Sequence, residues 1–245
     1  MNDSTALATT ARLVQRSLLR TAETARMYEL LSDHFEGVTL ADFQADLSQK
    51  NWIILIERGR EIVGFTTILA YETQCDGAPL SIIYSGDTIV SRQAWNTSLL
   101  PRAWIETVVS LRKFYPHGRF LWLLITSGFR TYRFLPVFWR EFFPRFDQST
   151  PVQWTQFIDE IARERFGSRY NQETGVVTLA NPQRLRDDLA SIPAGREHDP
   201  HVTFFMEKNP HHAKGDELVC LTELTPSNLT SAGRRMAANV LRDAW

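Results

Sequence analysis

The stretch from Ser85 to Asp87 places a carboxylate inside a segment that otherwise has the pattern of a buried strand. Alternate residues of a strand share a face, so Ser85 and Asp87 are expected to point the same way. Ile83 and Ile89 are expected on that same face. Gly86, which has no side chain to pack, indicates a bulge or the close approach of a ligand. Burial without a partner would raise the pKa of Asp87, which suits a general base working near neutral pH.

A polar turn follows this strand and leads into a helix predicted over 98–114. The unpaired backbone N–H groups and the dipole of a helix N-terminus attract anions. The turn offers Arg92, Asn96, Thr97 and Ser98 around that helix start, which favours a site for phosphate. The alternative is that Asn96 or Ser98 only caps the helix and that Arg92 is a surface charge.

Hydrophobic periodicity predicts the elements that position these residues, in the order β-αα-βββ-α-β-α, then further helices and a C-terminal hairpin. The expected strands are 11–18, 51–57, 62–72, 80–90, 119–126, 201–208 and 216–224. The expected helices are 21–35, 39–49, 98–114, 131–143, 151–166, 182–192 and 231–243. Because the linkers are short, we expect one α/β domain over 1–245, with a mixed sheet and helices on both faces.

Composition argues against several classes of protein. The chain has 245 residues, a formal net charge of −1 and a pI near 6.6, which give no general attraction to nucleic acid or membrane. We expect no signal peptide, because the first residues are polar and contain no apolar core. We expect no membrane span, because no uncharged apolar run approaches the ~20 residues that a span needs. Cys75 and Cys220 are expected to be reduced thiols in a cytoplasmic protein. His198, His201, His211 and His212 have no firm ligand spacing, so we expect no metal.

The element order and the turn after residue 90 resemble the GNAT superfamily of CoA-dependent N-acyltransferases. The resemblance covers 11–143, with 201–224 similar to the closing hairpin of that family. There, the fourth strand ends in a turn of pattern Q/R-x-x-G-x-G/A, whose amides hold the CoA pyrophosphate. The matching residues are Arg92, Trp95 and Thr97 in "RQAWNT", so the arginine fits and both glycine positions differ.

The resemblance implies a GNAT-like fold: a mixed, mostly antiparallel central sheet flanked by helices, with a helical insertion over 145–192 before the hairpin. It implies an acyltransferase in which Asp87 is the general base and Tyr132 the acid that protonates the departing thiolate. Ser85 completes the expected catalytic group. The residues implied for holding the thioester donor are Thr88, Val90, Arg92, Trp95, Asn96, Thr97, Ser98 and Ser127.

Two features of the middle of the chain bear on the donor. Residues 102–145 hold eight basic and two acidic residues, a net charge of +6, which suits an anionic ligand or an acidic partner. An aromatic cluster follows: Phe129, Tyr132, Phe134, Phe138, Trp139, Phe142, Phe143 and Phe146. The cluster forms either core packing or an apolar slot for a long acyl chain, and the basic residues are otherwise a solvated face. We therefore expect either acyl-CoA or an acyl-carrier protein as donor, and an amine of a small molecule or peptide as acceptor. The alternative is a catalytically inactive GNAT-shaped binding or scaffold protein.

Overall fold

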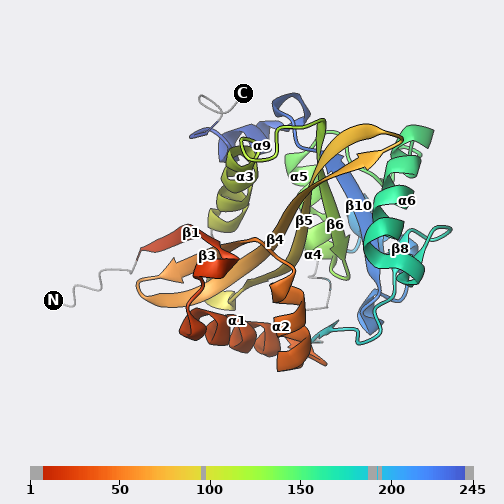
Figure 1. Ribbon diagram of the computed structural model, residues 1–245. Coiled ribbons are helices and arrows are strands. Elements are labelled where there is room, and N and C mark those ends of the chain that lie inside the picture. Colours follow the sequence, from red (N-terminus) through yellow and green to blue (C-terminus); the bar gives the residue numbers. More distant parts are fainter. Residues whose placement is uncertain (1–7, 95–97, 187–191, 193–194, 241–245) are drawn as a thin grey trace.

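The computed structural model describes residues 8–94, 98–186, 192 and 195–240 (Figure 1). The strands are β1 (Thr9–Gln15), β2 (Phe35–Glu36), β3 (Trp52–Arg58), β4 (Glu61–Cys75), β5 (Ala78–Val90), β6 (Arg119–Thr126), β7 (Tyr170–Asn171), β8 (Val176–Val177), β9 (Arg184–Leu185) and β10 (Glu217–Glu223). The α-helices are α1 (Thr21–His34), α2 (Leu40–Ser48), α3 (Leu99–Leu111), α4 (Phe129–Tyr132), α5 (Phe134–Phe138), α6 (Val152–Phe166), α8 (Pro200–Lys208) and α9 (Ser231–Met236). Within the described part of the chain, no helix combines the length and the apolar character that crossing a membrane requires.

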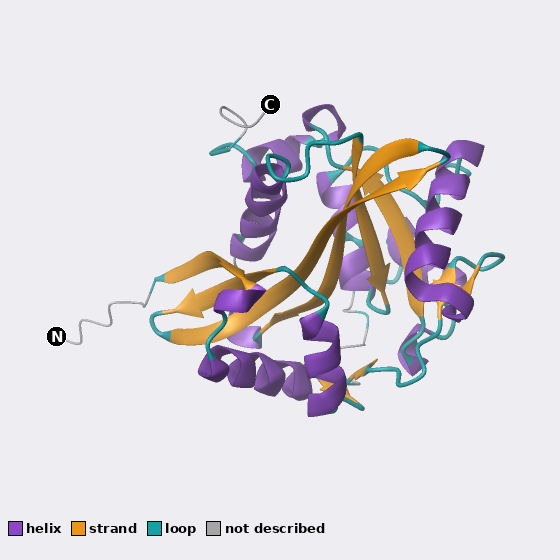
Figure 2. Cartoon of the chain, in the orientation of Figure 1, coloured by secondary structure: helices purple, strands orange, loops and turns teal. Residues whose placement is uncertain are grey.

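The central sheet has eight strands in the order β1-β3-β4-β5-β6-β10-β8-β7, with helices on both of its faces (Figure 2). Strands β5 and β6 run parallel, while the other neighbouring pairs are antiparallel. The predicted mixed, mostly antiparallel central sheet flanked by helices is therefore confirmed. A separate two-stranded sheet joins β2 to β9.

Alternating apolar side chains assign the helices to the two faces of the sheet. Ile54 belongs to a core cluster with residues of α3 and α5, whereas its neighbour Ile53 belongs to a cluster with α1 and α2. In the same way, Trp122 faces α3, and Leu123 packs with residues of α6. Helices α1, α2 and α6 therefore share one face, with α6 beside β8 and β10 (Figure 1).

The predicted C-terminal hairpin is wrong, because residues 200–208 form helix α8 rather than a strand. The side chain of Asp199 accepts a hydrogen bond from the backbone N–H of His201, and Pro200 occupies the first turn. Both are start signals for a helix. Helix α8 buries Val202 and Phe205, which are three residues apart and so lie on one helix face. Strand β10 instead pairs with β6 and β8.

Three of the predicted helices are shorter in the structure or are replaced by other elements. The aromatic segment 131–143 contains the short helices α4 and α5, and from Trp139 onward it continues as isolated bridges. The segment 182–192 contributes strand β9, which pairs with β2, while residues 187–191 lie outside the described residues. The last helix, predicted over 231–243, ends at Met236.

The parallel pair β5–β6 separates in the middle of the sheet. Pairing runs from Leu80 opposite Arg119 to Ser85 opposite Leu124, and no pairing follows it although β5 continues to Val90. The sheet is thereby opened beyond Ser85, next to the residues that the sequence singled out.

Candidate active site

A β-bulge at Gly86 and Asp87 reverses the faces of strand β5. Ser85 is opposite Ile68 and Thr88 is opposite Thr66, so two residues of β5, Gly86 and Asp87, face one residue of β4. An extra residue shifts the alternation of side chains by one position. The expectation that Ser85 and Asp87 point the same way is wrong for this reason.

The core clusters show the same reversal. Before the bulge, Ile83 packs in the α3 cluster, and after it Ile89 packs in the α1–α2 cluster. Ser85 stays on the α3 face, where its Oγ accepts a hydrogen bond of 2.8 Å from the indole N–H of Trp122. Asp87 instead faces the side of the sheet covered by α2 and α6.

Lys50 occupies the space beside the bulge. Its side chain is fully buried, its Nζ donates a hydrogen bond to Asp46, and it lies 5.2 Å from the centroid of the Tyr84 ring. Gly86 leaves room for this lysine, because a Cβ atom at Gly86 would stand 2.6 Å from the lysine Cε. The glycine predicted to mark a bulge or a close approach thus marks both.

Asp87 is half-buried and carries a perturbed carboxyl group. Desolvation, together with the negative charge of Asp46, raises the pKa of Asp87 to about 7, although Lys50 acts in the opposite direction. The cause is the one expected from the sequence, namely burial of a carboxylate. A carboxyl group with this pKa can take up a proton near neutral pH.

Glu217 is a second carboxylate of the same site, at the start of β10. Burial, followed by the charges of Asp87 and Asp46, raises the pKa of Glu217 to about 8. Asp87 and Glu217 repel each other when both are ionised, so they hold one proton between them more readily than none.

A cavity of about 880 Å³ occupies the opening between β5 and β6. Ser85, Gly86, Asp87 and Glu217 line its middle. On the α3 side of the sheet the lining comes from α3, α4 and α5, and includes Leu100, Trp104, Phe129, Arg130 and Phe134. On the other side it comes from α2 and α6. The carboxylates therefore lie between an end rich in aromatic side chains and an end rich in polar ones.

Several residues predicted to hold a donor line this cavity. Thr88, Val90 and Ser127 are among the lining residues, with Thr88 exposed and Ser127 buried. Ser98 is the N-cap residue of α3, and its side chain makes no capping hydrogen bond. Trp95, Asn96 and Thr97 lie outside the described residues.

Two arginines, Arg92 and Arg130, stand close together near the part of the cavity that α4 lines. The pKa of Arg130 is held below its usual value by partial burial and by the positive charge of Arg92. Arg130 lines the cavity. Two neighbouring guanidinium groups repel each other, and a bound anion with several negative oxygens would relieve that repulsion.

Tyr132 lies apart from the carboxylates. Its ring is fully buried, its hydroxyl donates a hydrogen bond of 3.0 Å to the carbonyl oxygen of Pro144, and burial raises its pKa well above the usual value. Tyr132 is not among the residues that line the cavity. The structure thus brings Asp87 and Ser85 to the cavity, on opposite faces of β5, and places Tyr132 in the core.

The aromatic and basic residues of the middle segment divide between packing and the cavity. Trp139, Phe142 and Phe143 are buried in the core, whereas Phe129 and Phe134 line the cavity. Several of the basic residues are held by acidic partners: Arg119 pairs with Glu223, Arg133 with Asp199 and Arg145 with Asp147. The net charge of this segment is consequently partly neutralised by the rest of the chain.

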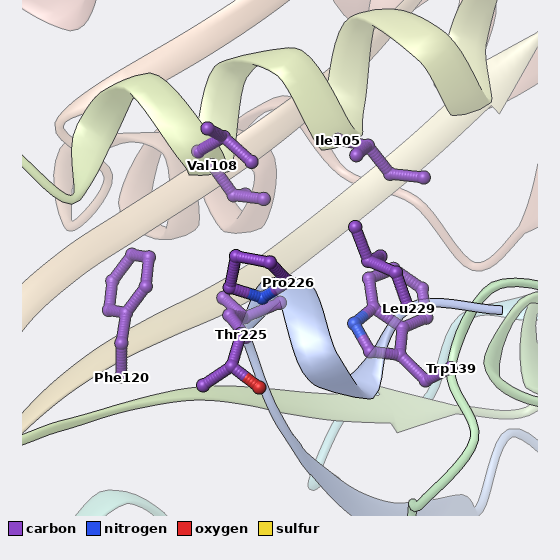
Figure 3. Close-up of a pocket in the computed structure, with 9 residues that line it drawn as sticks. Ile105, Val108, Phe120, Trp139, Thr225, Pro226 and Leu229 are labelled. Atoms are coloured by element: carbon purple, nitrogen blue, oxygen red, sulfur yellow. The ribbon is translucent and has the colours of Figure 1, made fainter. Parts of the chain in front are cut away.

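A second, much smaller cavity lies beneath α3 (Figure 3). Its volume is about 10 Å³, and Ile105 and Val108 of α3 project toward Trp139 and Leu229 around it. A water molecule needs several polar partners to remain in such a space. This apolar gap is too small for a substrate.

Sequence reasoning missed Lys50, Asp46, Glu217 and Arg165, which complete the site. Lys50 and Glu217 sit at element ends with no local pattern of their own, and their proximity to Asp87 depends on the packing of α2 and β10. Glu217 had one signal in the sequence, because it is a carboxylate at the start of the predicted strand 216–224.

Comparison with protein-family models gives no match, and comparison with curated protein sequences gives none either. Among solved structures, the chain is similar to a probable N-acyltransferase from Enterococcus faecalis, with 13% identity over 87% of this chain and 65% of that one, and a TM-score of 0.44. It is similar to ElaA from Escherichia coli, with 13% identity over 59% of this chain and 95% of the other, and a TM-score of 0.39. A GNAT-family N-acetyltransferase from Escherichia coli, YhbS in complex with CoA, shows 14% identity over 52% of this chain and 68% of its own, with a TM-score of 0.39. At these identities the likeness concerns the fold alone.

Proposed function

We propose that this chain is an N-acyltransferase. It moves an acyl group from a thioester, carried by CoA or by an acyl-carrier protein, to the amine of a small molecule or peptide. The observation that carries the proposal is the half-buried carboxyl group of Asp87, set on a bulge at the middle of a large cavity where two parallel strands separate. The cavity gives room for two substrates, and the carboxylate lies where they would meet.

In the proposed reaction the amine nitrogen attacks the thioester carbonyl, a C–N bond forms and the C–S bond breaks. Asp87 accepts the proton that the amine loses, directly or through water, and Glu217 lies near enough to influence that proton through its charge. The departing thiolate takes up a proton from water, and the carboxyl group of Asp87 returns its proton to water, so the products are the amide and the free thiol. Ser85 positions Trp122 against the strand rather than reaching the amine, because the bulge after it leaves Ser85 on the face opposite to Asp87.

The donor is proposed to bind at the aromatic end of the cavity. Thr88, Val90 and Ser127 would flank its pantetheine arm, since they line the opening between β5 and β6. Arg92, Arg130 and the first turn of α3, which begins after Ser98, would hold its phosphates. We also propose that the phosphates are held with the help of Trp95, Asn96 and Thr97, as the sequence predicts.

We propose that the transferred acyl group is apolar and that the cavity accepts long acyl chains. Trp104, Phe129 and Phe134 line the same end of the cavity and offer an apolar wall. An apolar pocket with a few convergent polar groups is the usual form of a small-molecule site.

The proposal is tested by donor binding and by transfer. We expect CoA, a long-chain acyl-CoA or an acyl-carrier protein to raise the Tm of the full chain. A donor at 100 times its Kd should add about 2.7 kcal/mol to the free energy of unfolding. We also expect release of free thiol when an acyl donor is mixed with a panel of amines. An absence of both responses with every donor would support the scaffold alternative instead.

Replacing the carboxylate tests the role of Asp87. Asp87→Asn should lower kcat/KM for amine acylation by about 100-fold or more, because general base catalysis contributes about 10²–10⁴-fold. In the unchanged protein kcat/KM should rise with pH through about 7, as the carboxyl group loses its proton. The matched control is Asp33→Asn, an exposed carboxylate of α1 outside the cavity lining. Full activity in Asp87→Asn would remove Asp87 from the mechanism.

A further inference from the structure

Arg165 brings a guanidinium group to the polar end of the cavity. It lies on α6, lines the cavity and is half-buried. Its guanidinium carbon stands 4.6 Å from the centroid of the Tyr84 ring, and one terminal nitrogen donates a hydrogen bond of 3.2 Å to the amide oxygen of Gln49. Stacking on Tyr84 and this bond hold the group in one orientation.

The charge of Arg165 is not matched by the protein. Among the residues that the structure describes, no carboxylate pairs with it, and its Nε is buried without a hydrogen-bond partner. Other arginines of similar exposure are paired, such as Arg119 with Glu223 and Arg133 with Asp199. A partly buried guanidinium normally has an anionic partner for its charge, and Arg165 has only the neutral amide of Gln49, so it has unused capacity to bind an anion.

The carboxylates of the site and Arg165 both affect the pKa of Tyr84 through their charges. Burial raises the pKa of the Tyr84 hydroxyl, the charges of Glu217, Asp46 and Asp87 raise it further, and the charge of Arg165 opposes them. Arg165 and the acidic group therefore lie around one tyrosine, within electrostatic reach of each other. The cavity offers a positive group and a negative group to a single bound molecule.

We propose that the acceptor amine also carries a carboxylate, as an amino acid does, with Arg165 binding the carboxylate while Asp87 and Glu217 receive the ammonium group. This inference rests on the proposed N-acyl transfer and defines the class of its acceptor. Guanidinium and carboxylate match in geometry, since both are planar and can form paired hydrogen bonds. A simple cationic amine would meet the carboxylates equally well and leave Arg165 without an anionic partner.

The test compares matched acceptors that differ only in the carboxylate. Amino acids and their decarboxylated amines form such pairs, for example phenylalanine with phenethylamine and lysine with cadaverine. For the pair that fits the pocket, we expect kcat/KM for the amino acid to exceed that for the amine by about 10- to 100-fold, the range of one charge-assisted contact. Arg165→Gln should remove this preference through KM, with little change for the amine, and Arg165→Lys should restore part of it.

Arg163→Gln provides the matched control on the same helix. Arg163 is exposed, bonds to Gln172 and does not line the cavity, so its replacement should leave the preference unchanged. Direct binding of the amino acid panel, measured by titration calorimetry without a donor, gives a readout that does not depend on transfer. We expect the unchanged protein to bind the amino acid. In Arg165→Gln we expect the Kd to rise by about 10-fold or more, as for the loss of one charge-assisted contact.

The outcomes separate this inference from the proposed function. Equal acylation of both members of every pair, or an equal loss for both in Arg165→Gln, would overturn the acceptor class while leaving N-acyl transfer in place. Binding of amino acids through Arg165 with no transfer from any donor would overturn the proposed function and keep the Arg165 site. Failure of the whole panel to bind or react would overturn the inference.

Discussion

Gly86 and Lys50 are packed so closely that a Cβ atom on the glycine would stand 2.6 Å from the lysine Cε. The same atom would stand 2.5 Å from the hydroxyl oxygen of Thr67. The bulge can therefore hold Asp87 beside a buried lysine only while position 86 has no side chain. The missing side chain at position 86 thus lets Lys50 approach Asp87, and the charge of Lys50 lowers the pKa of that carboxyl group.

Gly86→Ala should consequently change both stability and activity. Overpacking of this kind costs about 1–3 kcal/mol, which should lower the Tm by several degrees. The displaced Lys50 should also shift the pH dependence of amine acylation, since its charge lowers the pKa of Asp87. Chemical denaturation and a pH–rate profile measure the two effects.

Gly128→Ala is the matched control for that substitution. Gly128 has an ordinary extended backbone, and a Cβ atom there would meet the end of the Leu185 side chain at 3.3 Å, which can move. We expect a loss of stability below about 1 kcal/mol. If Gly86→Ala were as well tolerated as this control, the close approach of Lys50 would not be important for the site.

The buried hydrogen bond between Trp122 and Ser85 gives a second prediction. Ser85→Ala should destabilise the fold by about 1–3 kcal/mol, because the indole N–H of Trp122 loses its acceptor in the core. Ser81→Ala, on the same strand, should cost less, since Ser81 bonds to the carbonyl oxygen of the exposed His117. Denaturation curves compare the two variants, and equal costs would contradict the account.

Tyr132→Phe tests the hypothesis that Tyr132 protonates the thiolate. The hydroxyl is buried and bonded to Pro144, so we expect its removal to cost about 1 kcal/mol of stability and to leave kcat for acylation within a few-fold of the unchanged protein. Stopped-flow detection of the released thiol provides the rate. A loss of kcat beyond about 100-fold, with an intact fold, would support Tyr132 as the acid.

Most elements of the fold were predictable because their patterns are local. The helix predicted over 21–35 is Thr21–His34, and the strand predicted over 119–126 is Arg119–Thr126. The segment predicted as a strand over 201–208 is a helix, because Asp199 and Pro200 start a helix there although the apolar residues are dense enough for a strand. Density of apolar residues alone does not distinguish a short buried helix from a strand.

The candidate site was predictable only in part, for a different physical reason. Asp87 could be found because a carboxylate in a strand is unusual by itself. Its orientation could not, because the bulge that reverses it is a relation between β4 and β5. Glu217 and Lys50 approach Asp87 through packing between distant segments, which periodicity does not report.

The two carboxylates also predict how stability depends on pH. Asp87 and Glu217 have pKa values near 7 and 8 in the folded chain, against about 4 in an unfolded one. Between these values the folded state binds more protons than the unfolded state, so their contribution to stability is present below about pH 4 and is lost as the pH rises through 8. The charge of Lys50, which lies beside both carboxyl groups, opposes the rise in their pKa values.

Asp87→Asn/Glu217→Gln should remove this dependence. We expect the free energy of unfolding of the unchanged protein to fall more steeply than that of the double variant between about pH 5.5 and about pH 8.5. The partly buried His201 and His212 titrate in both proteins, so the difference between the two curves isolates the carboxylates. Denaturant titrations at several pH values measure it. Parallel curves would show that neither carboxyl group keeps its proton in the folded protein, and Asp87 would then be too weak a base for the proposed role.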